Sequence, residues 1–303
     1  MRSDPHGGAP LAREVWRLAW PAITHMFLVT LMFLVGRVMV GRYSPTALAS
    51  LQISGTLVWS TYSIFTAFSA GTLAVVARSI GAGDRDEAAR AARASLFFAA
   101  LLGVLVTVPI RLANGSLLRA LFPHASDAVL ADAGAYLHIV LPFLPLAFIE
   151  AIAAATLQGT GNTRAPLYVA TVGNIVNVVL SYLLIFGRFG FPELGVRGAA
   201  VGHAATMSIE GLLLAAVLLS KKSPLVLRHG RGGDVVALRR VLRVAWPAFG
   251  EKAIYHAGFL AFIAIIGLLG TEAMAANQAL LALEALCFLS ADGFGVATAA
   301  VIA

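Results

Sequence analysis

The stretch REVWRLAWPA (Arg13–Ala22) returns 226 residues later as RRVLRVAWPA (Arg239–Ala248). At this offset, without gaps, about 19 of 65 aligned positions are identical, including Gln52 with Gln278. Identity at a fixed offset is the signature of an internal repeat. Each copy opens a long apolar stretch, so the sequence predicts two related bundles of hydrophobic helices.

The apolar stretches are long enough to cross a membrane. The 303 residues have a mean hydropathy of +0.85 and only 12% charged side chains, whereas a soluble domain carries about 25%. A bilayer core needs roughly 20 apolar residues per helix. The nearly uncharged runs are 18–40, 47–77, 94–113, 128–156, 166–187, 198–219, 245–270 and 273–303. These runs are continuous rather than alternating, which predicts an all-α integral membrane protein of about eight spanning helices.

The repeat restarts with the seventh predicted helix. Because six is an even number, both copies enter the membrane from the same side, which predicts parallel repeats with a substrate site between them. We expect a cytosolic tail at 1–12, a six-helix lobe at 13–220, a basic linker at 221–240 and the start of a second lobe, helices 7 and 8, at 241–303. A complete repeat would need on the order of 440 residues. The chain is therefore expected to be truncated, with a complete eight-helix protein as the alternative.

The basic residues predict the orientation. If the N-terminus is cytosolic, Lys and Arg favour the inner loops by roughly three to one, as the positive-inside rule requires. The inner set is Arg2, Arg13, Arg17, Arg78, Arg85, Arg90, Arg93, Arg164, Lys221, Lys222, Arg228, Arg231, Arg239, Arg240 and Arg243, and the outer set is Arg42, Arg111, Arg119, Arg188 and Arg197. We therefore interpret the net charge of +7 as a determinant of membrane topology and not as a sign of nucleic-acid binding. We expect a multi-pass protein of the cell (inner) membrane. Its single cysteine, Cys287, excludes an intrachain disulfide.

Ionisable side chains inside a membrane are costly and are functional candidates. Glu251 lies four residues after Pro247, and Tyr255 follows one turn later on the same face. Glu284 and Asp292 lie about 80° apart round one helix and about 12 Å apart along it, so both could face one cavity. These three acids are candidates to bind a coupling proton or sodium ion, and the alternative for each is a structural ion pair or hydrogen bond.

Uncharged polar residues suggest a substrate cavity. Asn174, Asn177 and Ser181 follow an i, i+3, i+7 spacing on one helix face, where amides bind a ligand or join neighbouring helices. We include Gln52, Gln278 and Tyr255 in this cavity set. Glu150 and Glu210 are lone acids on separate predicted helices, which favours packing or snorkelling for both.

Arg37 lies near the outer end of the first helix, where a long cationic side chain snorkels to the surface. The histidine spacing fits no metal motif. Nucleotide-binding loops, HExxH and GxSxG are all absent from the sequence. We therefore expect no enzyme activity, no bound cofactor and no metal.

Five segments together resemble the multidrug and toxic compound extrusion (MATE) family. They are LAWPAI with VMVGRYSPTALASL (18–23, 38–51), SIGAGDRDEA (79–88), LQGTGNTRAPLYVATVGNIVNVVLSYLLIFG (157–187), GVRGAAVGHAAT (195–206) and LGTEAMAANQALLALEALCFLSADGFGVATAA (269–300). The resemblance covers the chain from about Arg13. It implies a two-lobe, twelve-helix fold and an antiporter, monomeric when complete, driven by a proton or sodium gradient. The antiporter would export lipophilic or cationic small molecules by alternating access.

The sequence departs from the family at two acidic positions. Many members carry Asp where this chain has Gly36, and Asp where it has Ser181. If ion coupling persists, we therefore expect it in the second lobe, around Glu251 and Glu284. The alternatives are a lipid-linked oligosaccharide flippase of related architecture and a non-transporting remnant. Arg37 and the acid-poor first lobe favour an anionic substrate, whereas the segments GNTRAPLY (161–168) and ALEALCF (282–288) fit the drug exporters better.

Overall fold

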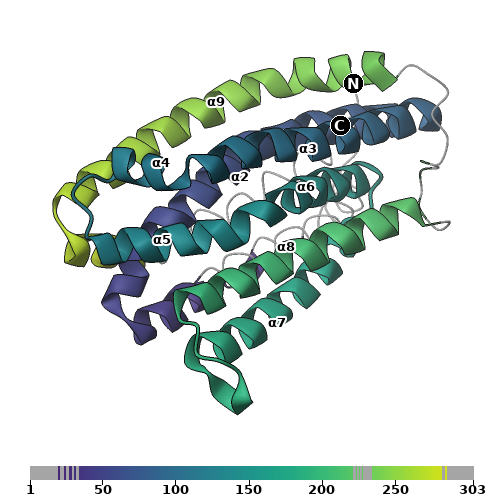
Figure 1. Ribbon diagram of the computed structural model, residues 1–303. Helices are drawn as coiled ribbons and strands as arrows, with labels where there is room; N and C mark the ends of the chain where they lie inside the picture. The colour runs from purple at the N-terminus through teal and green to yellow at the C-terminus, as the bar shows by residue number, and fades with distance from the viewer. Residues whose placement is uncertain are drawn as a thin grey trace, which may run out of the picture.

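The computed structural model describes residues 34–220 and 234–281, together with residues 20, 24, 27, 28, 31, 223, 225, 227 and 284. The regular elements in these ranges are helices (Figure 1). They are α2 (Pro45–Gly81), α3 (Arg85–Leu112), α4 (Asn114–Leu121), α5 (Asp127–Val140), η1 (Leu141–Phe143), α6 (Leu144–Gly159), α7 (Arg164–Phe186), η2 (Arg188–Gly190), α8 (Val196–Leu219) and α9 (Asp234–Leu268). Residues 34–43 and 271–281 are helical as well.

Six helical segments in the described ranges are long and apolar enough to cross a membrane: α2, α3, α5 through α6, α7, α8 and α9. They coincide with the second to seventh predicted runs, and the helices at 34–43 and 271–281 overlap the first and the eighth. The predicted all-α membrane fold is therefore confirmed.

Local sequence sets the helix ends. Ser44 caps α2 by accepting a hydrogen bond from the amide of Ala47 at 2.9 Å, and Pro45 occupies the first turn, where its missing N–H costs nothing. Asp84 caps α3 in the same way through the amide of Glu87, and this acidic first turn complements the helix dipole. Gly187, with φ +62°, ends α7 in the left-handed conformation that glycine adopts without strain.

Two features differ from a simple series of spanning helices. The fourth predicted run is interrupted at η1, because Pro142 and Pro145 lack the amide hydrogens that a continuous α-helix needs. The second feature is α4, a short helix between α3 and α5 that was not predicted. It is amphipathic, with the sequence NGSLLRAL, and too short to span a membrane.

The span made of α5 and α6 forms the centre of the bundle. About 56% of an 18-residue apolar stretch in this span is buried, whereas only 17% of the corresponding stretch in α9 is buried. The α6 helix contacts α2, α3, α7 and α8, the α7 and α8 helices pair closely, and α9 lies along α2 and also touches α3 (Figure 1). Exposed apolar side chains such as Leu105 and Ile265 cover the outer faces of α3 and α9, as a lipid environment requires.

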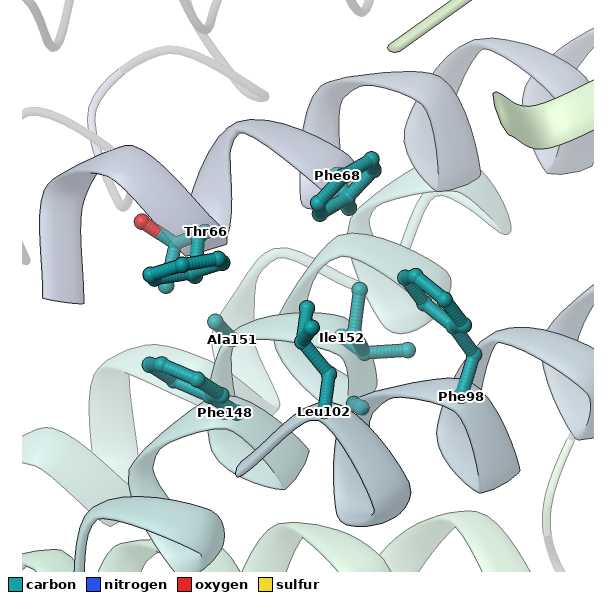
Figure 2. A pocket seen from close by; sticks show the side chains of 9 residues that line it. Thr66, Phe68, Phe98, Leu102, Phe148, Ala151 and Ile152 are labelled. Carbon is teal, nitrogen blue, oxygen red and sulfur yellow. The ribbon is translucent and has the colours of Figure 1, made fainter. Parts of the chain in front are cut away.

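The α2 helix ends, and α3 and α9 begin, at the same end of the bundle, which lies to the right in Figure 1. We call this end the linker end. Between α2, α3 and α6, part of the core is aromatic. Phe68 of α2 meets Phe98 of α3 edge to face with ring centroids 5.2 Å apart, and Leu102 of α3 and Phe148 of α6 complete the cluster (Figure 2). The gap that these side chains leave is only about 10 Å³. An apolar space of this size stays dry, so the cluster is packing rather than a binding site.

Candidate functional site

A cavity of about 70 Å³ with polar and apolar walls lies mainly among helices of the predicted first lobe, and we call it the first-lobe cavity. It is bounded by the helix at 34–43, by α2, α5, α7 and α8, and by Gln278 of the last described helix. Its walls are formed by Gly36, Arg37, Val40, Leu51, Gly55, Tyr136, Asn177, Ser181, Ala199, His203 and Gln278. Side chains from both sequence repeats therefore meet at one cavity.

Hydrogen-bonding groups gather around this cavity. The hydroxyl of Tyr136 lies 2.8 Å from Nδ1 of His203, which joins α5 to α8. Gln278 is only 2% exposed, and its amide oxygen has no hydrogen-bond partner among the described residues. A buried amide oxygen without a partner is costly, so this oxygen is available to a ligand or to water.

The structure brings together some of the predicted cavity residues. Asn177 and Gln278 line the first-lobe cavity, and so do Gly36 and Ser181, the two positions where acids are missing. Gln52 and Asn174 are buried, at 0% and 9% exposure, but they are not among the lining residues.

The position of Arg37 differs from the prediction that its side chain snorkels to the surface. Its side chain forms part of the cavity wall instead, because the last turns of the first helix face α5 and α8 there.

A pair of acids lies on α6 and α8. Glu150 of α6 accepts a hydrogen bond of 3.2 Å from the hydroxyl of Tyr62 on α2. Glu210 of α8 is close enough to Glu150 to interact electrostatically, and its carboxyl group lies directly against Gly173 of α7. Both acids lie nine residues before their helices end at the linker end, which corresponds to about 14 Å.

Sequence reasoning assigned these two acids to packing or snorkelling and did not place them together. The only available signal in the sequence was Gly173 on α7. The structure shows that any larger residue at this position would collide with Glu210. Among the residues that the structure describes, no three His, Cys, Asp or Glu side chains come together as a metal site.

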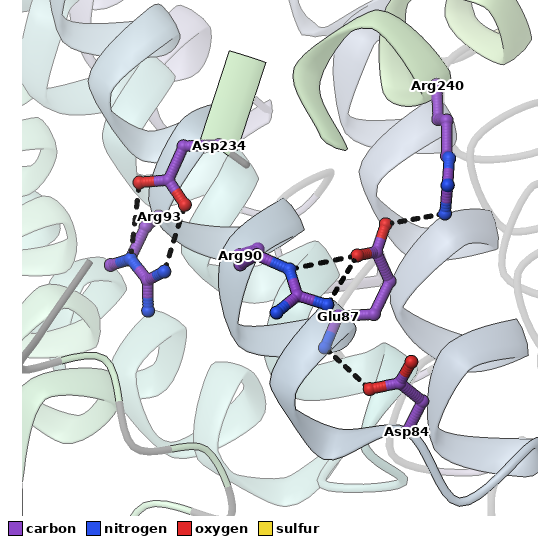
Figure 3. Close-up of polar contacts among 6 residues, drawn as sticks. All are labelled: Asp84, Glu87, Arg90, Arg93, Asp234 and Arg240. Carbon is purple, nitrogen blue, oxygen red and sulfur yellow. Dashed lines mark hydrogen bonds and ion pairs between the residues drawn. The ribbon is translucent and has the colours of Figure 1, made fainter. Parts of the chain in front are cut away.

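Ion pairs join α3 to α9 at the linker end (Figure 3). Glu87 of α3 accepts from Arg240 of α9 at 2.8 Å and, within α3, from Arg90 at 2.9 Å. Arg93 donates to Asp234 through two nitrogens, at 2.9 and 3.5 Å. We call these contacts the linker-end ion pairs. Since α9 is the first helix of the predicted second lobe, they connect the two sequence repeats.

Close packing of α9 on α2 continues from the same end. A Cβ atom at Gly71 would lie 2.5 Å from the carbonyl oxygen of Val241 and 2.8 Å from the Cβ of Ala245, so only glycine allows this approach. Phe249 stacks on Phe68 at 5.3 Å. Farther along α9, Nδ1 of the buried His256 lies 3.1 Å from the hydroxyl of Ser60.

The predicted second-lobe site residues do not lie in these contacts. Glu251 and Tyr255 are exposed on α9, where Tyr255 stacks on Phe259. Glu284 is exposed as well, and Asp292 lies outside the described residues, as does Cys287. The structure therefore brings Asn177, Ser181 and Gln278 together at one cavity and Glu150 close to Glu210. The predicted role of the second-lobe acids stays a prediction.

The fold and this buried polar interior define a multi-pass α-helical membrane protein. The model of the MatE family matches residues 21–183, more than half of the chain, so the chain belongs to the MatE (multidrug and toxic compound extrusion) family.

Two relatives illustrate the match. The chain is 32% identical over 288 residues to a probable multidrug resistance protein NorM from Thermotoga maritima, covering 95% of this chain and 61% of that protein. It is 28% identical over 295 residues to multidrug resistance protein MdtK from Pectobacterium atrosepticum, covering 95% and 63%. The chain thus spans about three fifths of the length of these relatives.

Solved structures share the fold. A MATE family transporter of the MOP superfamily in an outward-facing conformation has a TM-score of 0.82 at 23% identity, over 99% of this chain and 67% of that chain. A MOP superfamily transporter from Pyrococcus furiosus, described as having a binding pocket of reverse polarity, has a TM-score of 0.81 at 23% identity, over the same shares. An inward-facing MATE transporter has a TM-score of 0.77 at 21% identity, over 91% and 64%.

Proposed function

We propose that the chain forms the first lobe and the beginning of the second lobe of an ion-coupled secondary transporter. The transporter moves small organic molecules across the cell (inner) membrane by alternating access. The first lobe comprises residues 13–220, the linker 221–240 is cytosolic, and the second lobe begins at 241. Family membership and the relatives' names as multidrug resistance proteins support this assignment. Its cargo is a drug-like molecule that enters between the lobes.

The observation that carries the proposal is the nature of the α3–α9 contact. The linker-end ion pairs are partly exposed, with Arg240 59% and Asp234 38% accessible at the side chain. Exposed ion pairs contribute only about 0–1 kcal/mol each, so such a contact forms and breaks at little cost. A transporter that alternates access needs a closure of this kind on one side of its cargo site.

The acid pair supplies a route for coupling to protons. Two carboxylates close together in a low-dielectric interior cannot both be ionised without a large penalty, so one of them holds a proton. The Tyr62 hydroxyl donates to Glu150, and Glu210 interacts electrostatically with Glu150, so a proton on either carboxyl group affects the other. Glu251, Glu284 and Asp292 remain second candidates for coupling in the second lobe.

Ion-driven export from everted membrane vesicles tests the proposal. A proton gradient, and separately a sodium gradient, is applied to vesicles that contain the longest available form of the protein. We expect proton-driven accumulation of lipophilic dyes that Glu150→Gln and Glu210→Gln abolish, while Glu272→Gln, at an exposed position, has no effect. Accumulation that needs sodium, or that persists in both variants, would contradict coupling through this pair.

A further inference from the structure

The tip of the α7–α8 hairpin carries an exposed aromatic side chain on a strained backbone. Phe189 has φ +56° and ψ +32°, and among the described residues it is the one residue other than glycine with a positive φ. A side chain is disfavoured in this left-handed conformation because its Cβ atom approaches the next carbonyl oxygen. The Phe189 side chain is also 88% exposed, so packing against the protein does little to offset the strain. An outlier of this kind points to a role outside the fold.

The base of the loop holds the tip in place. The amide of Leu194 donates to the carbonyl oxygen of Leu184 at 2.7 Å and closes the hairpin. A Cβ atom at Gly187 would lie 2.9 Å from the Cβ of Glu193, so the two sides of the loop are in close contact there. Residues 188–191 therefore form a tip on a closed base, at the bottom of Figure 1.

The length of α7 places this tip at the surface of the bilayer. The helix has 23 residues, which cover about 35 Å, and the hydrocarbon core is roughly 30 Å thick. Arg164 begins the helix and Arg188 follows its end. With Arg164 at one boundary of the core, Arg188 and Phe189 lie at the opposite boundary. Including its head groups, a bilayer is about 40–45 Å thick, so the tip falls within the head-group layer and not in free water.

The composition of the tip fits this layer. Phe191 is a second exposed aromatic residue, at 44%, and Arg188 is exposed beside Phe189. Aromatic rings gather at the interface of membrane and water, and a long cationic side chain keeps its charge at the level of the lipid phosphates. Apolar area removed from water is favourable, so lipid contact would offset the strain that the protein itself leaves uncompensated.

We propose that residues 188–191 are an interfacial lipid anchor. The rings of Phe189 and Phe191 enter the boundary between head groups and acyl chains, and Arg188 lies at the level of the phosphates. The anchor fixes the depth of the α7–α8 hairpin in the membrane. It depends only on the chain being a membrane protein, and it stands or falls independently of the proposed transport function.

Spin labels on single cysteines test the depth of the tip. Cys287→Ser removes the one native cysteine, and Phe189→Cys is then labelled and reconstituted in phosphatidylcholine liposomes. Collision with oxygen, which concentrates in hydrocarbon, is compared with collision with a water-soluble nickel chelate. Leu105→Cys, at a 65% exposed position on the outer face of α3, is the lipid reference. Ala82→Cys, in the loop before α3, is the water reference.

We expect the ratio of oxygen to nickel collisions at Phe189 to lie between the two references, well above the ratio at Ala82. A ratio equal to that at Ala82 would place the tip in water and overturn the proposal. A label at Phe189 that is shielded from both reagents would show that protein covers the tip, which also contradicts lipid contact. Phe191→Cys repeats the measurement at the second ring, with the same expectation and the same contrary results.

Thermal unfolding in detergent provides a test that needs no label. Phe189→Gly removes the ring and also relieves the backbone strain, because glycine adopts a positive φ freely. We expect this variant to unfold at the same temperature as the unmodified chain or higher. Phe148→Ala, at a buried position with 3% exposure, should unfold at a lower temperature. A decrease for Phe189→Gly as large as that for Phe148→Ala would mean that the ring packs against protein, and the anchor would be wrong.

Discussion

Replacing Gly71 tests the contact between α2 and α9 most directly. This glycine lies where α9 approaches α2 closely, and a Cβ atom there would lie 2.5 Å from the carbonyl oxygen of Val241. Gly71→Ala therefore forces α9 away from α2 by roughly 1 Å, since ordinary contacts begin near 3.5 Å. Gly55→Ala is the matched control on the same helix, because its Cβ would meet only Leu51, at 3.8 Å.

The magnitude follows from two opposing effects. Alanine in a helix interior is more favourable than glycine by about 0.5–1 kcal/mol, and both variants gain this amount. Overpacking a close contact costs about 1–3 kcal/mol, and only Gly71→Ala meets this cost. The free energy of unfolding should thus be about 1–3 kcal/mol lower for Gly71→Ala than for Gly55→Ala.

Thermal unfolding in detergent, followed by circular dichroism, measures this difference. Hydrogen exchange then locates it, and we expect faster exchange of the backbone amides of 241–249 in Gly71→Ala alone. If the two variants unfold at the same temperature and α9 is equally protected in both, the close approach at Gly71 does not hold α9 in place, and our account of this contact is wrong.

Three further predictions concern the charged groups. A double-mutant cycle of Glu87→Gln and Arg240→Gln, measured by hydrogen exchange at the start of α9, should give a coupling energy of about 0.2–1 kcal/mol. This coupling energy should decrease as the salt concentration rises, and additive effects of the two substitutions would contradict a direct ion pair. Tyr62→Phe removes the donor to Glu150 and should lower stability by about 1 kcal/mol and slow proton-driven dye uptake, whereas Tyr182→Phe, at an exposed position, should change neither. Glu251→Gln should reduce ion-driven export by the longest form of the protein if the second lobe takes part in coupling, and unchanged export would exclude that role.

Much of the fold could be predicted because each spanning helix is specified by its own composition. The apolar run 166–187 became α7 (Arg164–Phe186), and the run 198–219 became α8 (Val196–Leu219). The exceptions arise from local chemistry that hydropathy does not measure. The prolines of LPFLP interrupt the fourth span, and α4 is amphipathic rather than apolar.

The site was harder to predict because its residues come from different helices. The face shared by Asn177 and Ser181 was visible from their spacing, and both line the cavity. Glu150 and Glu210 are single acids about 60 residues apart in the sequence, and nothing in either helix shows that the two interact or that Tyr62 bonds to one of them. Their meeting depends on which faces of α6 and α8 turn inward, and that is decided by packing among four helices.

The cavity and the acid pair share the closely packed helices α7 and α8. His203 in the cavity wall and Glu210 in the acid pair are seven residues apart on α8, which places them on nearly the same face and about 10 Å apart. Between them, the hydroxyl of Thr206 lies 3.2 Å from the carbonyl oxygen of Gly173 on α7. A movement of this helix pair would displace one wall of both sites together. If binding of a ligand changes the proton affinity of the acid pair by some factor, protonation of the pair changes the affinity for the ligand by the same factor.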